Sequence, residues 1–166
     1  MVTPIVRVGP VQPVTLKRHL EETTGVRKAI LVVDGDYGTR AFYSRVIGHD
    51  PELREFEVLT VRNIAEALEV YRGNQRRIVA VTTGRVMFDL DEGDRIVRGI
   101  RAIETSGRGV GIAMISGELP EEAERQSIGA DEYLEKGGQM HIDKYAGTVK
   151  RMIALTKQRR PDLNLT

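Results

Sequence analysis

The sequence predicts an α/β domain in which a parallel β-sheet carries helices on both faces. Short apolar runs rich in valine and isoleucine alternate with longer stretches whose apolar residues recur at helical spacing. The apolar runs are continuous, with no alternation of apolar and polar residues, which is typical of strands covered on both faces. A chain of 166 residues is also long enough to bury a core without metals or disulfides. Five strands alternating with five helices therefore indicate a doubly wound sheet.

The first half of the domain is predicted to contain two strands and two helices. Residues 29–34 form an apolar run that ends in an acid, and residues 56–61 form the second strand. Between them, the apolar residues of 37–50 fall on one side of a helix. The residues expected to face inward there are Ala41, Phe42, Val46 and Ile47. A second helix begins after Asn63, a residue type that caps helix N-termini, and ends at Gly73.

The second half continues the same alternation. The predicted strands are 77–83, 110–116 and 131–136, and the predicted helices are 91–107, 120–129 and 143–160. Pro120 suits the first turn of its helix, where its missing N–H costs nothing, and Gly129 suits the end of that helix. Pro161 is expected to stop the last helix.

Composition and charge narrow the class of protein. The 25 basic and 24 acidic residues nearly balance, so electrostatics gives no reason to expect a nucleic-acid ligand. No cysteine is present, which excludes disulfides, thiol chemistry and cysteine-bound zinc. The sequence shows neither a signal peptide nor a long apolar segment. We therefore expect a cytoplasmic protein with no membrane contact.

Three regions are expected along the chain. Residues 1–27 form an N-terminal extension, residues 28–160 form the folded domain, and residues 161–166 form a C-terminal tail. Leu16 and Leu20 lie four residues apart, which is the spacing of a short helix within the extension. We expect this helix to contact the domain or a partner.

Parallel strands end together at one edge of the sheet, where ligands and chemistry gather in folds of this type. The sequence around these predicted strand ends resembles the receiver domain of two-component response regulators, of which the single-domain chemotaxis regulator is the simplest. The stretches that carry the resemblance are ILVVDGD, EGDRIVRGIR, IAMISGE and IGADEYLEKGG, in the family's order and near its spacing. The resemblance spans residues 28–160. It implies a flavodoxin-like sheet with strand order 2-1-3-4-5.

In receiver domains an aspartate at the end of the third strand accepts a phosphoryl group, while acids after the first strand hold Mg²⁺. The resemblance places Asp34 at the first of these acids. It makes Ser116 the switch hydroxyl, Tyr133 the switch aromatic and Lys136 the lysine that binds phosphoryl oxygens. Movement of the hydroxyl and the aromatic carries the signal to the neighbouring surface.

The phosphoacceptor aspartate, however, is missing. Aligning residues 77–83 as the third strand places Thr82 or Thr83 at its position, whereas aligning without a gap from Gly93 places Arg85 there. A threonine hydroxyl is not ionised at neutral pH and no neighbouring base is apparent, so it is a poor nucleophile.

The metal-binding acids are also incomplete. The acid that normally follows Asp34 is replaced by Gly35, and Asp36 comes one residue later. Asp34 and Asp36 are weak candidates for Mg²⁺ ligands, because a third carboxylate is lacking, and we expect no bound metal or other cofactor. We expect Asp36 to cap the following helix and Lys136 to pair with Asp34 across the pocket. If Arg85 occupies the acceptor position, it is expected to pair with Asp34 instead.

The leading hypothesis is a pseudo-receiver, a signalling domain without enzymatic activity that acts through protein–protein contacts in a two-component-type pathway. Its vestigial pocket comprises Asp34, Asp36, Thr82, Thr83, Ser116 and Lys136. Ser116 and Tyr133 then form a switch that a partner drives. The partner surface is expected between Pro120 and Met152, and a homodimer through the same surface is the alternative.

Two alternatives remain open. An active receiver would use a non-standard acid, Asp89 or Asp91, with Mg²⁺ held by Asp34 and Asp36. A small-ligand sensor would use the strand-end pocket, because folds of this class bind small molecules at that edge.

Overall fold

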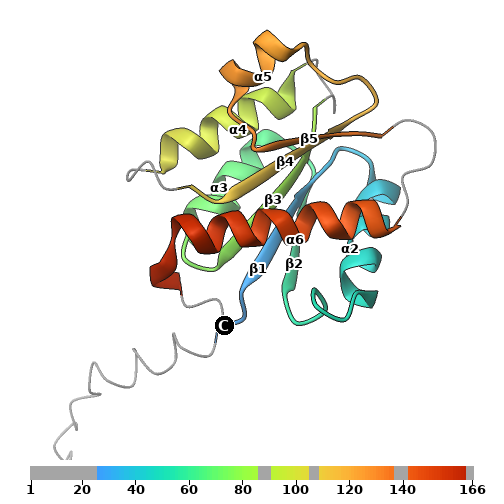
Figure 1. Ribbon diagram of the computed structural model, residues 1–166, viewed down its shortest axis with the longest axis vertical. Coiled ribbons are helices and arrows are strands. Elements are labelled where there is room, and N and C mark those ends of the chain that lie inside the picture. The colour runs from blue at the N-terminus through green and yellow to red at the C-terminus, as the bar shows by residue number, and fades with distance from the viewer. Residues whose placement is uncertain (1–25, 86–90, 105–108, 137–141, 164–166) are drawn as a thin grey trace, which may run out of the picture.

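A computed structural model of the protein describes residues 26–85, 91–104, 109–136 and 142–163. Five strands form one parallel sheet in the order β2-β1-β3-β4-β5 (Figure 1). The strands are β1 (Ala29–Val33), β2 (Glu57–Val61), β3 (Ile78–Gly84), β4 (Gly111–Ser116) and β5 (Glu132–Glu135). The predicted fold class and strand order are confirmed.

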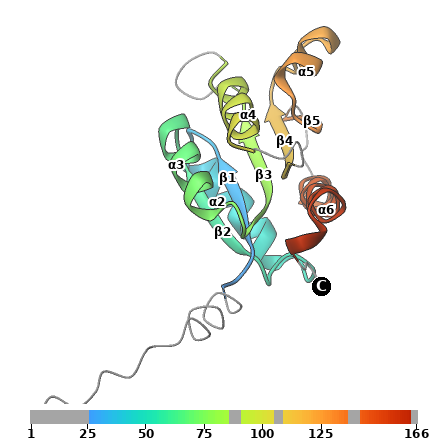
Figure 2. The same cartoon turned by 90° about the vertical axis from the view of Figure 1, so that its left-hand side faces the viewer.

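Helices cover both faces of this sheet. They are α2 (Tyr37–His49), α3 (Ile64–Asn74), α4 (Glu92–Ile103), α5 (Glu122–Ile128) and α6 (Ile142–Arg159), followed by a 3₁₀ helix, Pro161–Leu163. The α2 and α6 helices cover one face, while α3 and α4 cover the other with α5 beside α4 (Figures 1 and 2). The short helix expected around Leu16 and Leu20 lies outside the described residues. Within the described ranges, no helix is long and apolar enough to cross a membrane.

The core consists of two apolar layers separated by the sheet. Leu31, Ile96 and Ile100 belong to the layer under α3 and α4, and Tyr43 and Tyr145 belong to the layer under α2 and α6. The rings of Tyr43 and Tyr145 stack with centroids 4.1 Å apart. Burying each such side chain contributes about 2 kcal/mol, so these layers hold the strand ends in register.

The orientation of α2 differs from the prediction at one position. Phe42 was expected to face inward, but 39% of its surface is exposed, whereas the adjacent Tyr43 is 3% exposed. The prediction for Phe42 is wrong because Tyr43 stacks on Tyr145 and thereby sets the rotation of the helix. Val46 and Ile47 are buried as predicted.

Asn63 and Gly129 cap helices as the sequence predicted, whereas α5 begins at Glu122, two residues after the predicted start at Pro120. Asn63 precedes α3, and its side chain accepts a hydrogen bond from the Glu66 N–H at 2.9 Å. Gly129 ends α5 with φ 87°, a conformation that favours glycine.

Gly93 sets the distance between α4 and the end of β3. A Cβ atom at this position would lie 2.0 Å from the backbone oxygen of Gly84, so no other residue type fits without movement. The N–H of Gly93 also donates to the backbone oxygen of Arg85 at 2.9 Å. The start of α4 is therefore held directly against the carboxyl end of β3.

Candidate functional site

A cavity of about 230 Å³ lies at the edge of the sheet where the parallel strands end. It opens between the ends of β1, β3, β4 and β5. The residues that matter for its chemistry are Asp34, Gly84, Arg85, Ser116, Glu118 and Lys136. Four strands thus contribute to one small polar site, as expected for an open parallel sheet.

Asp34 is the buried acid of this cavity. It is only 7% exposed, and its Oδ1 accepts a hydrogen bond from the backbone N–H of Asp36 at 2.9 Å. Its Oδ2 lies 3.6 Å from Nζ of Lys136, so the predicted ion pair between these residues is present. Lys136 Nζ also donates to the hydroxyl of Thr39 at 3.3 Å. The lysine therefore connects the end of β5 with the carboxyl end of β1 and the start of α2.

Asp36 caps α2 and does not line the cavity. Its Oδ2 accepts a hydrogen bond from the Thr39 N–H at 2.6 Å. This backbone hydrogen bond holds the pKa of the Asp36 carboxyl below its usual value. The carboxylate is thus engaged at the helix terminus, as the sequence predicted.

Gly84 is the residue of β3 that faces Asp34. The strand extends one residue beyond the predicted boundary, and Gly84 pairs in register with Ile115 on β4. A Cβ atom built on Gly84 would lie 3.1 Å from Oδ2 of Asp34. A side chain at position 84 would therefore project into the cavity beside the buried acid. Sequence reasoning missed this residue because a glycine after two threonines resembles the start of a loop.

Thr82 and Thr83 lie outside the cavity. The Thr82 hydroxyl forms a buried hydrogen bond with the hydroxyl of Tyr145, with the two oxygens 3.1 Å apart. Thr83 points to the opposite face of the sheet, since side chains alternate along a strand, and its hydroxyl donates to the backbone oxygen of Gly84. Neither threonine is brought together with Asp34, Ser116 and Lys136.

Arg85 lines the cavity, but its charge is engaged elsewhere. Its guanidinium lies 3.1 Å from Glu124 on α5, 3.5 Å from Asp94 on α4 and 3.4 Å from Asp91. The ion pair with Asp34 that one alignment suggested is not formed. Burial raises the pKa of the Asp94 carboxyl, although the charge of Arg85 opposes this effect. Arg85 therefore ties the end of β3 to the starts of α4 and α5.

Ser116 and Tyr133 occupy the two positions that the resemblance assigns to a switch. Ser116 is 6% exposed and lines the cavity, and its backbone oxygen accepts a hydrogen bond from the Lys136 N–H at 2.7 Å. The Tyr133 hydroxyl donates to the backbone oxygen of Arg125 at 2.9 Å, and the Arg125 guanidinium lies over its ring. Tyr133 therefore connects β5 to α5.

Asp91, one of the two acids proposed as substitute acceptors, is not brought into the cavity. Asp91 precedes α4 with φ 64°, and its carboxylate is 62% exposed beside Arg85. Asp89 lies outside the described residues. Among the residues that the structure describes, no group of three or more histidines or acids is placed to hold a metal ion.

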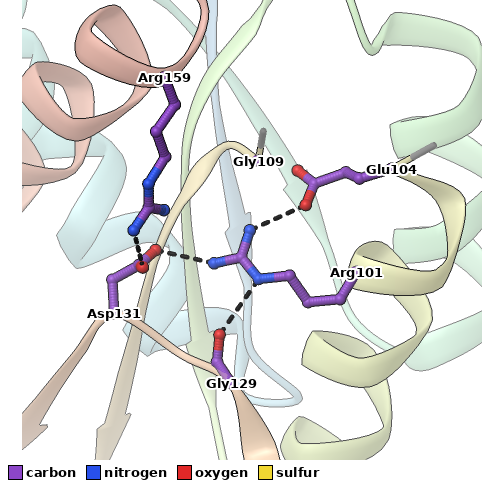
Figure 3. A pocket seen from close by; sticks show the side chains of 6 residues that line it. All are labelled: Arg101, Glu104, Gly109, Gly129, Asp131 and Arg159. Carbon is purple, nitrogen blue, oxygen red and sulfur yellow. Dashed lines mark hydrogen bonds and ion pairs between the residues drawn. The ribbon is translucent and has the colours of Figure 1, made fainter. Parts of the chain in front are cut away.

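A second cavity, of about 370 Å³, lies where β4 and β5 begin, and Figure 3 shows the residues that line it. Arg101 is at its centre, donating to Glu104 at 2.9 Å, to Asp131 at 2.8 Å and to the backbone oxygen of Gly129 at 3.1 Å. Arg159 donates to the other oxygen of Asp131 at 2.6 Å. Because each charged side chain here already has a partner of opposite sign, the cluster serves to join α4, β5 and α6.

Solved structures of receiver domains share this fold. A response regulator receiver domain protein from Clostridium thermocellum is 24% identical, with a TM-score of 0.64, and the match covers 79% of this chain and 98% of that one. The chemotaxis protein CheY4 of Vibrio cholerae is 20% identical, with a TM-score of 0.62, and coverage of 76% and 99%. The non-phosphorylated HemR receiver domain from Leptospira biflexa is 21% identical, with a TM-score of 0.60, and coverage of 77% and 95%. No protein-family model and no curated protein sequence matches the chain. These similarities show the fold.

Proposed function

We propose that this chain is a pseudo-receiver, a signalling domain that acts by binding another protein and accepts no phosphoryl group. The observation that carries the proposal is the absence of a side chain at Gly84, the position that faces Asp34. The receiver fold of the solved neighbours supports a role in two-component-type signalling.

The chemistry of the strand ends supports this assignment. Phosphoryl transfer to a receiver requires a carboxylate beside the metal-binding acids, and position 84 offers no atom that could attack phosphorus. Thr82 and Thr83 are un-ionised and bonded elsewhere, and Arg85 carries the wrong charge. We therefore propose that Gly84 stands where the family has its phosphoacceptor. No catalytic role is assigned to the chain.

The proposed partner surface lies between Pro120 and Met152, as the resemblance implies. Within it, the N-cap residue Glu121 and the α5 residues Glu122 and Glu124 are exposed acids. Tyr133 and Arg85 both bind α5, so any change at the strand ends reaches this helix through two side chains. A protein partner binds there, and a second copy of the chain is the alternative occupant.

Intact-mass measurement after incubation with Mg²⁺ and a small phosphodonor tests the proposal. The expected result is an unchanged mass. A gain of one phosphoryl group would contradict the proposal and support the active-receiver alternative. In that case, Asp89→Asn and Asp91→Asn would show which acid carries the group, because only the true acceptor variant would lose the added mass.

A further inference from the structure

We propose that the outer edge of β2 is a dimerisation surface, where two copies of the chain pair their β2 strands in antiparallel orientation and join their sheets. β2 forms one edge of the five-stranded sheet, and β5 forms the other (Figure 1). An edge strand presents backbone N–H and C=O groups that can bind another strand. The inference goes beyond the proposed function, because it concerns a different part of the molecule from the proposed partner surface.

The hydrogen bonds between β2 and the β1 side of the sheet show which groups of β2 point outward. The Glu57 N–H and the Val61 oxygen form such bonds, at 2.9 Å and 3.2 Å. Backbone groups point to alternate sides along a strand, so the N–H and C=O of Val58 and Thr60 point away from β1. Within the described residues, no other strand pairs with them.

The chain protects its two sheet edges differently. β5 has four residues and carries a glutamate at each end, Glu132 and Glu135, and such charges oppose pairing with another strand. β2 has five residues and contains no lysine or proline, and its one charged residue, Glu57, is paired with Arg77. The outward position Thr60 is exposed. β2 therefore lacks the features that usually prevent edge-to-edge pairing.

Two-fold symmetry restricts the register of such a pair. Two strands related by a two-fold axis in a continuous sheet place residues of the same face opposite each other. With Leu59 opposite Leu59 of the second copy, Val58 lies opposite Thr60 on each side of the axis. Each such pair exchanges both backbone hydrogen bonds, so every outward group of the two strands is used.

The two neighbouring registers are less favourable. Moving the axis to Thr60 requires the Arg62 N–H, which already donates within its own chain at 3.2 Å. Moving the axis to Val58 requires the Phe56 N–H, which already donates within its own chain at 3.0 Å. The register centred on Leu59 breaks no existing hydrogen bond. This self-complementarity is why we assign the edge to a second copy of the chain.

Apolar side chains flank the pairing on both faces of the sheet. Leu59 packs on the layer under α3 and α4, so the two copies of Leu59 would meet at the axis on that face. Val58 and Phe56 pack on the layer under α2 and α6. All three are only partly buried in a single chain, so pairing removes further apolar surface from water. The contact is small, and we therefore expect a weak dimer.

Such a dimer would leave the proposed partner surface free. β2 and β5 are opposite edges of the sheet, and the proposed surface between Pro120 and Met152 includes β5. A two-fold dimer would therefore present this surface twice. Presenting two copies raises the avidity for a partner that is itself dimeric.

Amide hydrogen exchange of the full chain, compared at about 10 µM and about 1 mM, tests the proposal. The amides of Val58 and Thr60 should exchange at least about threefold more slowly at the higher concentration. Sedimentation at that concentration should detect the mass of a dimer. A monomer at both concentrations would overturn the proposal. Equal protection of the two amides at both concentrations would also overturn it, because the edge would then be covered within one chain.

Two variants at Thr60 test the edge itself. Thr60→Pro removes an outward N–H and no hydrogen bond to β1, and proline is tolerated at such positions of edge strands. The variant should stay folded and lose the dimer. Thr60→Lys keeps the backbone N–H but places a charge at the edge, and should weaken dimerisation by at least about tenfold. A dimer that persists in both variants would overturn the proposal.

Ala123→Lys is the matched control, because it adds the same charge at an exposed position of α5. Dimerisation through β2 should be unchanged in this variant. Loss of the dimer in Ala123→Lys but not in Thr60→Lys would place the contact on the proposed partner surface and would overturn the assignment to β2. These outcomes are independent of the proposed function, which the intact-mass measurement tests separately.

Discussion

The Cβ position of Gly84 lies 3.1 Å from Oδ2 of Asp34, so the buried acid faces a space that any side chain at position 84 would fill. Asp34 is balanced by Lys136, whose ammonium lies 3.6 Å away. The cavity thus brings together Asp34, Ser116 and Lys136, the acid, the hydroxyl and the lysine that the receiver resemblance implies. Under the proposed function, Gly84 stands where the family has its phosphoacceptor.

Thr82 is expected to act in the core and not in the pocket. Thr82→Val should destabilise the fold by about 2 kcal/mol, because the fully buried hydroxyl of Tyr145 loses its partner. Thermal or denaturant unfolding would measure the loss. The double variant with Tyr145→Phe should lose about 1 kcal/mol less stability than the sum of the losses of the two single variants. Strictly additive losses would contradict the hydrogen bond.

Gly93 is expected to be irreplaceable where α4 meets β3. Gly93→Ala would place a Cβ atom 2.0 Å from the Gly84 oxygen, which should cost about 3 kcal/mol of stability. Gly48→Ala is the matched control, because nothing lies within 4 Å of its Cβ position in α2. That control should stabilise the fold by roughly 0.5 kcal/mol in a denaturant titration. Equal effects would refute the close contact.

Asp131 is expected to make stability depend on pH. Burial alone would raise the pKa of its carboxyl, but hydrogen bonds from Arg159 and the Ile112 N–H, with the charge of Arg101, lower it. Its contribution is therefore fully present above the ordinary aspartate pKa of about 4 and is lost as the pH falls through the lower, folded-state value.

Asp131→Asn should consequently cost about 2 kcal/mol at neutral pH and nothing at strongly acidic pH, where the wild type has lost the same contribution. Urea unfolding across this pH range would measure the difference. Glu122→Gln serves as the control, since its carboxylate is 79% exposed and should shift stability by less than about 0.5 kcal/mol. A loss for Asp131→Asn that does not change with pH would contradict the ion pairs.

Arg85 is expected to hold α5 in place. Arg85→Gln removes the charge shared by Asp94 and Glu124 and should destabilise the fold by about 2 kcal/mol. Hydrogen exchange of the α5 amides should become faster than in the wild type. Arg62→Gln, which breaks an exposed ion pair with Glu66, should change stability much less, because solvent screens that pair. Unchanged exchange in Arg85→Gln would contradict this role.

The sequence predicts the fold well because the patterns that indicate strands and helix ends depend on residues close together in the chain. Apolar runs give the strands, and Asn63 and Gly129 mark helix ends through their own backbone hydrogen bonds and conformation. Phe42 and Tyr43 show the limit, since both are aromatic neighbours on α2 and only the stacking on Tyr145 decides which is buried. Helical spacing alone does not contain this tertiary contact.

The sequence predicted some residues of the candidate site and missed another, depending on whether the residue has a recognisable side chain. Asp34, Ser116 and Lys136 end their strands and carry recognisable side chains, so their convergence follows from the topology. Gly84 has no side chain to recognise, and its position depends on where β3 ends, which local sequence sets only to within a few residues. The register with β1 and β4 identifies it.

The most direct test is an amide NMR titration with Mg²⁺ followed by beryllofluoride, which mimics a phosphoryl group on an aspartate. In the wild type, the amide signals of Ser116, Tyr133 and Lys136 should not shift. The double variant Gly35→Asp/Gly84→Asp, which places carboxylates at the two positions proposed here to lack them, should respond. Coordinated shifts of these residues in the wild type would show that another acid completes the site, and would contradict the assignment of this chain as a pseudo-receiver.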